Sequence, residues 1–236
     1  MRHTIRLFKL LLAVFFLPSA VALAFWLGLV PARLLPFAPI DLARTDQWFV
    51  DLRLAALKAS PQLCRDVLKP PLIIAEPAGD VPFQDGCGSI NSVSVHQIAG
   101  ARLVADKLSC PMAGALTMWL EHVVQPAALD ILGARVSSVH HMGTYACRNI
   151  MGSKRLSSFR SQHASANAID VSAFELANGR SVSVLKFWRT PGAESSFLHR
   201  IHDGACGYFR VALGPDFNEA HRDHFHLDRG AFKSCK

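Results

Sequence analysis

Histidines and aspartates gather near the C-terminal end of the sequence. Three histidines, His221, His224 and His226, fall within six residues, and Asp223 and Asp228 lie beside them. Because residues i and i+2 of a strand face the same side, His224 and His226 can both point into one cleft. One of these two imidazoles can then bind a metal ion while the other meets a substrate.

A second pair of metal-binding residue types lies upstream, where His163 precedes Asp170 by seven residues. The two positions have opposite parity and cannot face one way on a straight strand. We therefore expect residues 164–167 to turn, so that a loop delivers His163 and the following strand delivers Asp170. Two imidazoles and one carboxylate, with a fourth position left for water, form a ligand set expected of a catalytic zinc.

Both stretches resemble the motifs of a superfamily of zinc peptidases. Residues 161–170, SQHASANAID, and residues 223–226, DHFH, are similar to the Ser-x-His-x(6)-Asp and His-x-His motifs that group D-Ala-D-Ala metallopeptidases with lysostaphin and hedgehog. The peptidase motif often has glycine where this chain has Ala166, a departure that concerns the geometry of the turn and no ligand.

A wider set of short motifs resembles the bacterial extensin-like C-terminal domain family, over roughly residues 40–236. The stretches that carry this resemblance are residues 87–88 (CG), 124–127 (VQPA), 145–148 (YACR), 203–206 (DGAC) and 213–226 (LGPDFNEAHRDHFH). The two resemblances together imply an α+β domain similar to hedgehog and to the D-Ala-D-Ala peptidases.

The resemblance also implies a role for the residues of the motifs. The zinc ligands that it implies are His163, Asp170 and His226, and the catalytic residues are Asp223, as general base, and His224, as a donor to the oxyanion. Elementary chemistry agrees, because zinc lowers the pKa of its bound water towards ~7 and a carboxylate can take the proton. The alternative for Asp223 is a turn cap.

Two further residues are implied to contact the substrate. Arg148 resembles an arginine that holds a substrate carboxylate or peptide carbonyl, with a structural ion pair as the alternative. Ser161 is expected to orient the substrate or the site by hydrogen bonding. Asp228 is a candidate acceptor for a ligand imidazole. His221 has no assigned role, and His96, His122, His199 and His202 are expected to be structural. His140 and His141 are adjacent, and because adjacent strand residues face opposite sides, we do not expect them to act as joint ligands.

The elements that position these residues follow from hydrophobic spacing and from proline and glycine. The predicted helices are two short ones in residues 45–68 interrupted at Pro61, one over 109–124 that Pro126 breaks or kinks, and one over 195–209. The predicted strands lie near 90–98, 135–141 and 223–228, with a hairpin over 169–184 that turns at Asn178-Gly179. Residues 70–88 are expected to be irregular. This mixed order indicates an α+β fold with an antiparallel sheet and flanking helices.

The N-terminal segment predicts a membrane anchor ahead of this domain. Residues 10–30 carry no charge and are numerous enough to span a bilayer as one helix. Arg2, Arg6 and Lys9 precede this span and only Arg33 follows closely, so we expect residues 1–9 in the cytoplasm and the body in the periplasm. Residues 31–44 form a proline-containing linker, and the domain occupies residues 45–236. Cleavage after an Ala-x-Ala pattern at residues 22–24 is the alternative.

Six cysteines also indicate an oxidising compartment. No Cys-x-x-Cys pair occurs, so three disulfides are favoured over a zinc-thiolate cluster. Six cysteines permit 15 pairings. Our preference is for sequence neighbours: Cys64 with Cys87, Cys110 with Cys147, and Cys206 with Cys235.

Charge argues against a nucleic-acid partner. The net charge is +7, but residues 45–236 hold only 20 basic and 17 acidic side chains. The resemblance implies a zinc peptidase that acts on peptidoglycan stem peptides or crosslinks at D-amino-acid bonds. With the N-terminal anchor, we predict a single-pass inner-membrane protein whose peptidase domain lies in the periplasm. The alternative is a catalytically silent wall-binding or scaffold module that keeps zinc for folding. The sequence leaves the oligomeric state open.

Overall fold

The computed structural model describes residues 14, 16–152 and 155–236. The chain divides into two compact units, one made of residues 1–38 and 46–49 and the other of residues 39–45 and 50–236. All of the predicted site residues belong to the second unit.

The described part of the first unit contains helical backbone at residues 16–26 and a short 3-10 helix, η1 (Ala32–Leu34). Large apolar side chains such as Phe16, Leu17 and Trp26 are exposed along this segment. In the described ranges, no helix combines the length and the hydropathy that a membrane span requires. Residues 10–13 and 15 of the predicted span, and the predicted cytoplasmic residues 1–9, lie outside the described residues.

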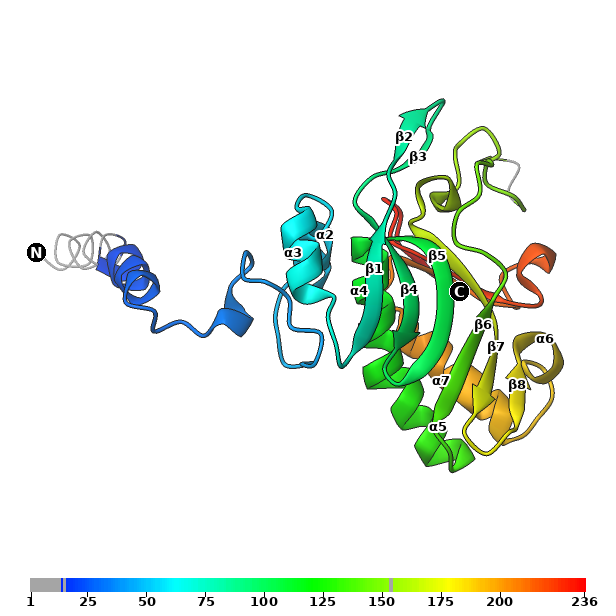
Figure 1. The fold of residues 1–236 in the computed structure, drawn as a ribbon. Coiled ribbons are helices and arrows are strands. Elements are labelled where there is room, and N and C mark those ends of the chain that lie inside the picture. Colours follow the sequence, from blue (N-terminus) through cyan, green and yellow to red (C-terminus); the bar gives the residue numbers. More distant parts are fainter. Residues whose placement is uncertain (1–13, 15, 153–154) are drawn as a thin grey trace, which may run out of the picture. The chain divides into compact units, whose positions relative to one another are not determined.

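The second unit is built on a nine-stranded sheet with the order β1-β4-β5-β6-β7-β10-β9-β11, in which β8 pairs with β7 (Figure 1). Its strands are β1 (Ile73–Ala78), β4 (Ser92–Ile98), β5 (Ala101–Ser109), β6 (Val136–His141), β7 (Ala168–Leu176), β8 (Ser181–Ser183), β9 (Val211–Leu213), β10 (Phe225–Asp228) and β11 (Ser234–Cys235). Only the β5–β6 and β9–β11 pairs are parallel. A separate hairpin consists of β2 (Val81–Gln84) and β3 (Cys87–Ser89).

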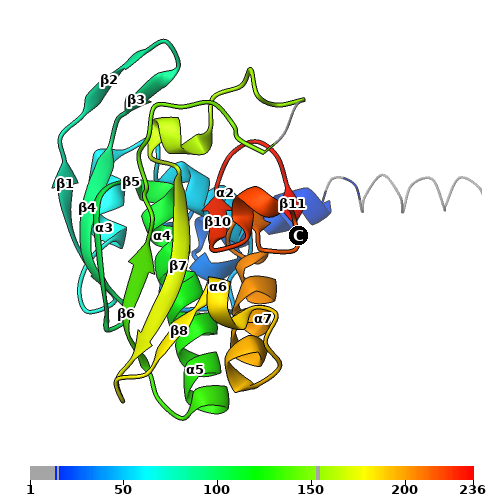
Figure 2. The ribbon, with the colours of Figure 1, turned by 90° about the vertical axis from the view of Figure 1, so that its right-hand side faces the viewer.

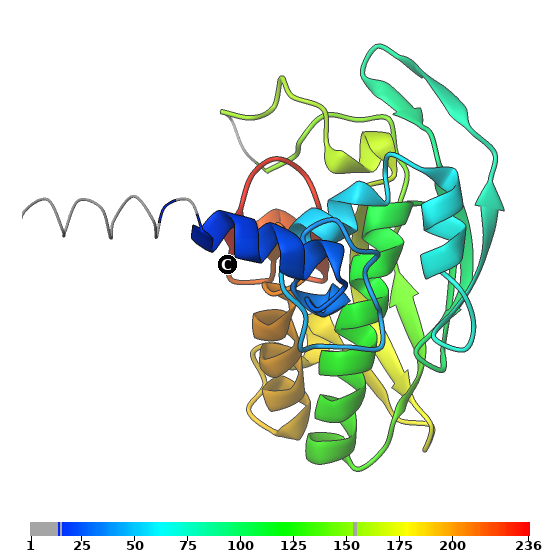
Figure 3. The ribbon, with the colours of Figure 1, turned by 90° about the vertical axis from the view of Figure 1, so that its left-hand side faces the viewer.

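Helices cover one face of this sheet (Figures 2 and 3). The helices are α2 (Val50–Ala56), α3 (Pro61–Val67), α4 (Cys110–Trp119), α5 (Gln125–Leu132), α6 (Val184–Phe187) and α7 (Ala193–Ala205), with a π-helix, η2 (Leu120–Val124), and two 3-10 helices, η3 (Gln162–Ser165) and η4 (Glu219–His221). Helices α4, α5 and α7 form the covering layer. The predicted mixed α+β fold, with a mostly antiparallel sheet and flanking helices, is thus confirmed.

The central helix begins as predicted but does not stop at Pro126. The Ser109 hydroxyl caps α4 by accepting from the backbone N–H of Met112, and Pro111 lies in the first turn. The chain then passes through η2 into α5, which ends at Gly133 with φ 71°. The π-helical turn accommodates a proline that cannot donate a backbone hydrogen bond.

The core lies between this helical layer and the sheet. Trp119 is fully buried, packs edge-to-face on Phe174 and Phe209, and donates its indole N–H to the carbonyl oxygen of Ile201 at 2.8 Å. Trp119 lies on α4 and contacts both β7 and α7, so its burial holds these three elements together. Its N–H is hydrogen-bonded, so the burial leaves no unpaired polar group. The layer thereby fixes β7, the strand that carries Asp170.

The predicted irregular stretch over residues 70–88 is wrong, because it contains β1, β2 and β3. Pro77 lies in β1, which is an edge strand of the sheet, and Pro82 lies in the two-stranded hairpin. A proline is tolerated at an edge because no neighbouring strand needs its missing N–H. Strand β5 was also not predicted.

Three disulfides are present, and two differ from the predicted pairing. Cys206–Cys235 is confirmed, whereas the structure joins Cys64 to Cys110 and Cys87 to Cys147. Cys64 lies on α3 beside the first turn of α4, and Cys87 lies on the β2–β3 hairpin beside the segment that leads to the site. Proximity in sequence fails here because the tertiary fold brings α3 to the start of α4, and the β2–β3 hairpin to the segment around Cys147.

Candidate metal centre

Three elements converge on one point of the sheet. His163 lies on η3, and the Ser161 hydroxyl begins that turn by accepting from the backbone N–H of His163 at 3.4 Å. Ala166 ends the turn with φ 53°, a left-handed conformation that glycine adopts without a Cβ penalty. The chain then enters β7, where Asp170 is directly opposite His226 of β10 in an antiparallel pair. The predicted turn between His163 and Asp170 is present.

The ligand atoms of His163, Asp170 and His226 lie within 4.8 Å of one another. His163 Nε2 is 3.3 Å from His226 Nδ1 and 3.1 Å from Asp170 Oδ2, and His226 Nδ1 is 2.8 Å from Asp170 Oδ1. A tetrahedral zinc with bonds of about 2.0–2.1 Å holds its ligand atoms about 3.3 Å apart. Across the described ranges, no other group of three His, Cys, Asp or Glu residues converges in this way. The donor set therefore fits zinc with one open position.

The outer nitrogen of each imidazole has its own acceptor. His163 Nδ1 donates to the carbonyl oxygen of Thr144 at 3.3 Å, and His226 Nε2 donates to Asp228 Oδ2 at 3.1 Å. These hydrogen bonds orient the rings so that His163 Nε2 and His226 Nδ1 face Asp170. Such partners select the ring nitrogen that is free to bind a metal.

The cluster is strongly coupled electrostatically. Burial alone would raise the pKa of Asp170, but hydrogen bonds from His163 and His226 outweigh it and hold that pKa far below its usual value. Burial alone would lower the pKa of His226, but hydrogen bonds to Asp170 and Asp228 raise that pKa to about 9. In the metal-free protein, a proton on His226 Nδ1 therefore supplies the positive charge between these carboxylates.

Asp223 and His224 form a pair at the edge of the cluster. His224 Nδ1 donates to Asp223 Oδ1 at 2.8 Å, and His224 Nε2 lies 3.6 Å from Asp170 Oδ1. The His224 side chain is 10% exposed and that of Asp223 is 34% exposed. The imidazole thus faces the candidate metal position while the carboxylate borders solvent.

The predicted substrate residues lie in different surroundings. The Arg148 guanidinium is 3.7 Å from Asp170 Oδ2 and is 36% exposed, so it reaches both the cluster and solvent. Ser161 is buried and its hydroxyl serves the His163 turn, which agrees with a role in orienting the site. The Cys87–Cys147 disulfide holds the segment before Arg148 to the β2–β3 hairpin, and Arg160 donates to the carbonyl oxygen of Asp85 on the same hairpin at 2.8 Å.

The histidines expected to be structural, and the pair His140 and His141, do not join the described ligand group. His140 pairs with Glu175, and the rings of the others make these contacts: His122 with the Leu42 carbonyl, His141 with the Val104 carbonyl, His199 with the Trp188 carbonyl, and His202 with Trp188 and Phe225. His221, which had no assigned role, does lie beside the cluster, with its ring centroid 5.3 Å from that of His224. Burial, followed by the nearby His226 and His224, lowers the pKa of His221 to about 4.

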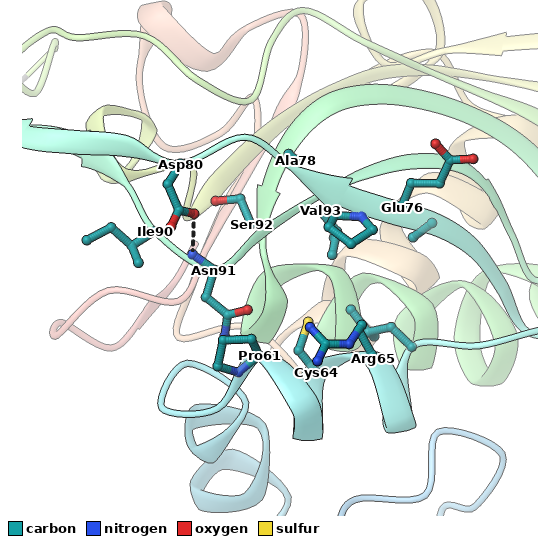
Figure 4. A pocket seen from close by; sticks show the side chains of 13 residues that line it. Pro61, Cys64, Arg65, Glu76, Ala78, Asp80, Ile90, Asn91, Ser92 and Val93 are labelled. Atoms are coloured by element: carbon teal, nitrogen blue, oxygen red, sulfur yellow. Dashed lines mark hydrogen bonds between the residues drawn. The ribbon is translucent and has the colours of Figure 1, made fainter.

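A cavity of about 160 Å³ lies elsewhere, between α3 and strands β1 and β4 (Figure 4). Arg65, Glu76 and Val93 line it, and Asn91 at one end donates its backbone N–H to Asp80 at 3.0 Å. The cavity is smaller than the roughly 300–1,000 Å³ of ordinary small-molecule sites, and none of its lining residues belongs to the metal cluster. We therefore assign the chemistry to the histidine cluster.

Comparison with known proteins identifies the family. The family model described as Extensin-like protein C-terminus matches residues 62–236, which is most of the chain. The chain belongs to this family. No curated protein and no solved structure gives a significant match.

Two contributors to the site had no sequence signal. The Thr144 carbonyl is a backbone group, which the residue type does not reveal, and Asn218 contacts His221 through a turn whose geometry the sequence did not define. Asp228 carried a weak signal through its spacing of two residues from His226, and the structure places it at hydrogen-bonding distance.

Proposed function

We propose that this chain is a zinc-dependent peptidase that cleaves peptidoglycan stem peptides or crosslinks at bonds formed by D-amino acids. The observation that carries the proposal is the convergence of His163 Nε2, His226 Nδ1 and the Asp170 carboxylate, with one position left open. The resemblance of the motifs to D-Ala-D-Ala metallopeptidases, lysostaphin and hedgehog supports the reaction class and a fold of that kind.

The open position is what favours catalysis over a closed structural site. His163, Asp170 and His226 would hold zinc, with Thr144 and Asp228 keeping the imidazoles in place. Zinc, when bound, lowers the pKa of a water molecule and polarises the scissile carbonyl. A structural zinc site is usually completed by a fourth protein ligand, and the described residues offer no fourth ligand at the cluster.

Asp223 is proposed to take the proton from the attacking water. Its Oδ1 accepts from His224 Nδ1, and within the described residues Oδ2 has no hydrogen-bond partner and is open to receive that proton. His224, oriented by Asp223, is proposed to donate from Nε2 to the oxyanion in the form that carries hydrogen on both ring nitrogens, since its Nδ1 hydrogen is already donated to Asp223. A positioned general base contributes on the order of 10²–10⁴ in rate, and an oxyanion donor on the order of 10²–10³.

Arg148 is proposed to bind a carboxylate or carbonyl oxygen of the substrate. Its guanidinium lies 3.7 Å from Asp170 and has exposed surface to offer, which supports this role over a purely structural ion pair. Planar guanidinium groups suit carboxylates because two N–H groups can donate side by side. Ser161 is proposed to orient the site through the His163 turn.

The proposed location is the periplasmic face of the inner membrane, with residues 10–30 as a single-pass anchor. The uncharged run and the basic residues before it support this orientation. Three disulfides support export of the domain to an oxidising compartment, where they can form. Peptidoglycan peptides are the peptide substrate found in that compartment.

Replacing Asp223 with Asn tests the mechanism. Asp223→Asn should retain one zinc per chain but lose hydrolysis of crosslinked muropeptides by roughly 10²-fold or more, since the basic oxygen is gone. Mass spectrometry of the digests and metal analysis give the two readouts. Asp216→Asn, an exposed carboxylate paired with Arg189, is the matched control and should keep both.

The same assay separates the enzyme from a silent scaffold. A scaffold that keeps zinc for folding would bind the metal yet leave every muropeptide intact, even in the unsubstituted chain. His226→Ala should abolish stoichiometric zinc in either case, and full occupancy in that variant would overturn the ligand assignment. Hydrolysis that persists unchanged in Asp223→Asn would refute the role of Asp223 while leaving the metal site standing.

A further inference from the structure

His221 is held in a fixed orientation beside the metal cluster. It lies on η4, and its ring centroid is 5.3 Å from that of His224 and 5.8 Å from that of His226. Phe217 packs edge-on against the same ring, at 5.4 Å between centroids. Contacts on several sides leave the imidazole little freedom to rotate.

Asn218 determines which nitrogen of His221 carries hydrogen. The Asn218 amide nitrogen Nδ2 faces the carbonyl oxygen of Gly152 at 3.5 Å and donates to it. The amide oxygen Oδ1 therefore faces His221, where it accepts from Nδ1 at 2.7 Å. A neutral imidazole has one donor and one acceptor nitrogen, so with hydrogen on Nδ1 the acceptor is Nε2.

The close packing of Gly152 against Asn218 supports this assignment. Gly152 has φ 75°, and a Cβ at this position would lie 3.0 Å from Asn218 Nδ2 and 3.2 Å from the Ala220 Cβ. The absence of a side chain there lets the carbonyl-bearing backbone approach the amide. The contact between Asn218 Nδ2 and the Gly152 carbonyl therefore sets the orientation of the Asn218 amide, independently of His221.

Nε2 of His221 is left available. Within the described residues it has no hydrogen-bond partner, and it is not among the buried polar atoms that lack one. His221 also lies outside the group whose ligand atoms converge, so it is not a fourth metal ligand. The ring is half-buried, and Asn218 holds the hydrogen on Nδ1, so Nε2 is the nitrogen that can accept.

We propose that His221 Nε2 accepts a hydrogen bond from a backbone amide N–H of the bound peptide. The proposal rests on the proposed peptidase function and adds to it a residue that positions the substrate. An amide N–H suits a neutral acceptor, whereas an ammonium group would be repelled by Arg148, whose charge already acts on His221. Arg148 would donate to a substrate oxygen and His221 would accept from a substrate N–H, so the two would bind complementary groups of the peptide backbone.

Peptide affinity, measured without turnover, tests the proposal. The full chain carrying Asp223→Asn is loaded with zinc and titrated with a crosslinked muropeptide dimer by calorimetry. Adding His221→Phe, which keeps a ring against Phe217 but removes the acceptor, should weaken Kd about five- to tenfold, the scale of one neutral hydrogen bond. His96→Phe, at an exposed histidine of β4, is the matched control and should leave Kd unchanged.

A second pair of measurements distinguishes loss of the His221 hydrogen bond from misfolding of the variant. His221→Gln supplies an amide oxygen and should recover part of the affinity lost in His221→Phe, with zinc stoichiometry retained in both. Long-range 1H–15N spectra of the histidine-labelled chain should show His221 protonated at Nδ1, and Asn218→Leu should release this preference. Hydrogen at Nε2 in the unsubstituted chain, or equal Kd for His221→Phe, would overturn the proposal.

Hydrolysis by the unsubstituted chain is assayed separately, so the two ideas can fail independently. Binding without hydrolysis would end the peptidase proposal while the Kd comparison still decides the role of His221. Absence of any binding by the Asp223→Asn chain would overturn the His221 proposal itself.

Discussion

Asp228 accepts two hydrogen bonds, one through each carboxylate oxygen. Oδ2 accepts from His226 Nε2 at 3.1 Å and Oδ1 accepts from the backbone N–H of Gly230 at 2.8 Å. In Asp228→Asn, one of these two donors must face an NH₂ group. We expect zinc affinity to fall by about 10–100-fold, the usual cost of disturbing a partner of a metal-binding histidine. Competition with a chromophoric chelator measures it.

The control for that variant is again Asp216→Asn, which removes an exposed carboxylate that pairs with Arg189 and is not one of the proposed ligands. Its zinc affinity should match that of the unsubstituted chain. Equal affinity for Asp228→Asn and Asp216→Asn would mean that Asp228 does not support the ligand.

His226 also gives the metal-free protein a defined dependence on pH. Its pKa rises from 6.5 to about 9 because hydrogen bonds to Asp170 and Asp228 outweigh its burial. A folded-state pKa above the unfolded value stabilises the fold fully below about pH 6.5, and this stability is lost as the pH rises through about 9. We therefore expect the free energy of unfolding in a chelator to fall between these values.

Urea unfolding of the unsubstituted chain and of His226→Asn over this pH range measures the effect, because titrations elsewhere cancel in the difference. Zinc should reverse the trend, since the ion must displace the Nδ1 proton and its affinity should rise with pH up to about 9. A difference between the two chains that is constant with pH would contradict the role given to His226.

The candidate metal ligands were predictable because histidine and aspartate are recognisable in the sequence as residue types that can bind metal ions. His163, Asp170 and His226 follow from type, spacing and resemblance, and a turn between the first two was required by their parity. The Thr144 carbonyl and the Asn218 amide were not predictable, because each acts through a tertiary contact that no local pattern specifies.

Among the elements, the two strands of the β2–β3 hairpin pack so closely that adding one methyl group, in Gly88→Ala, tests their packing. A Cβ on Gly88 would lie 2.6 Å from the Phe83 Cα of the opposite strand, and backbone cannot move aside easily. We expect Gly88→Ala to lower the free energy of unfolding by about 1–3 kcal/mol. Gly79→Ala, where no atom lies within 4 Å, should be nearly neutral, and thermal unfolding of both variants compares them.

Equal stability of the two glycine variants would show that the hairpin is looser than its packing indicates. The result bears on the site because the Cys87–Cys147 disulfide joins this hairpin to the segment ending at Arg148. A shifted hairpin should therefore also reduce peptide affinity while leaving the zinc ligands untouched.

Strands β1 and β5 escaped prediction for two different physical reasons. β1 contains Pro77, which a central strand would not tolerate, and its position at an edge becomes known only from the sheet. β5 does alternate, with Ala101, Leu103 and Ala105 buried between exposed residues, but alanine gives a weak hydrophobic signal. Helix α4, with a serine cap and an early proline, was recognisable because its signals are local.

On the scale of the whole molecule, cysteine usage and the distribution of charge both bear on the proposed location. The described cysteines are all in disulfides, which are typical of proteins that fold where thiols are oxidised. Most of the net charge belongs to the N-terminal 44 residues, and a near-neutral body argues against polyanion binding as the main activity. The proposed export of the domain is therefore tested through the N-terminal residues.

Reporter fusions test this orientation. Arg2, Arg6 and Lys9 precede the uncharged residues 10–30, so the positive-inside rule predicts that they stay in the cytoplasm and that the body is exported. Alkaline phosphatase joined after Lys236 should be active, and a reporter that works only in the cytoplasm should be silent at the same place. Replacing the three basic residues with Gln removes the asymmetry and should reduce the exported fraction, whereas replacing Lys58 and Lys69 of the body with Gln should not. Activity of the cytoplasmic reporter at Lys236, together with free thiols in natively prepared protein, would contradict the proposed topology. It would also contradict the proposal that the domain acts on peptidoglycan.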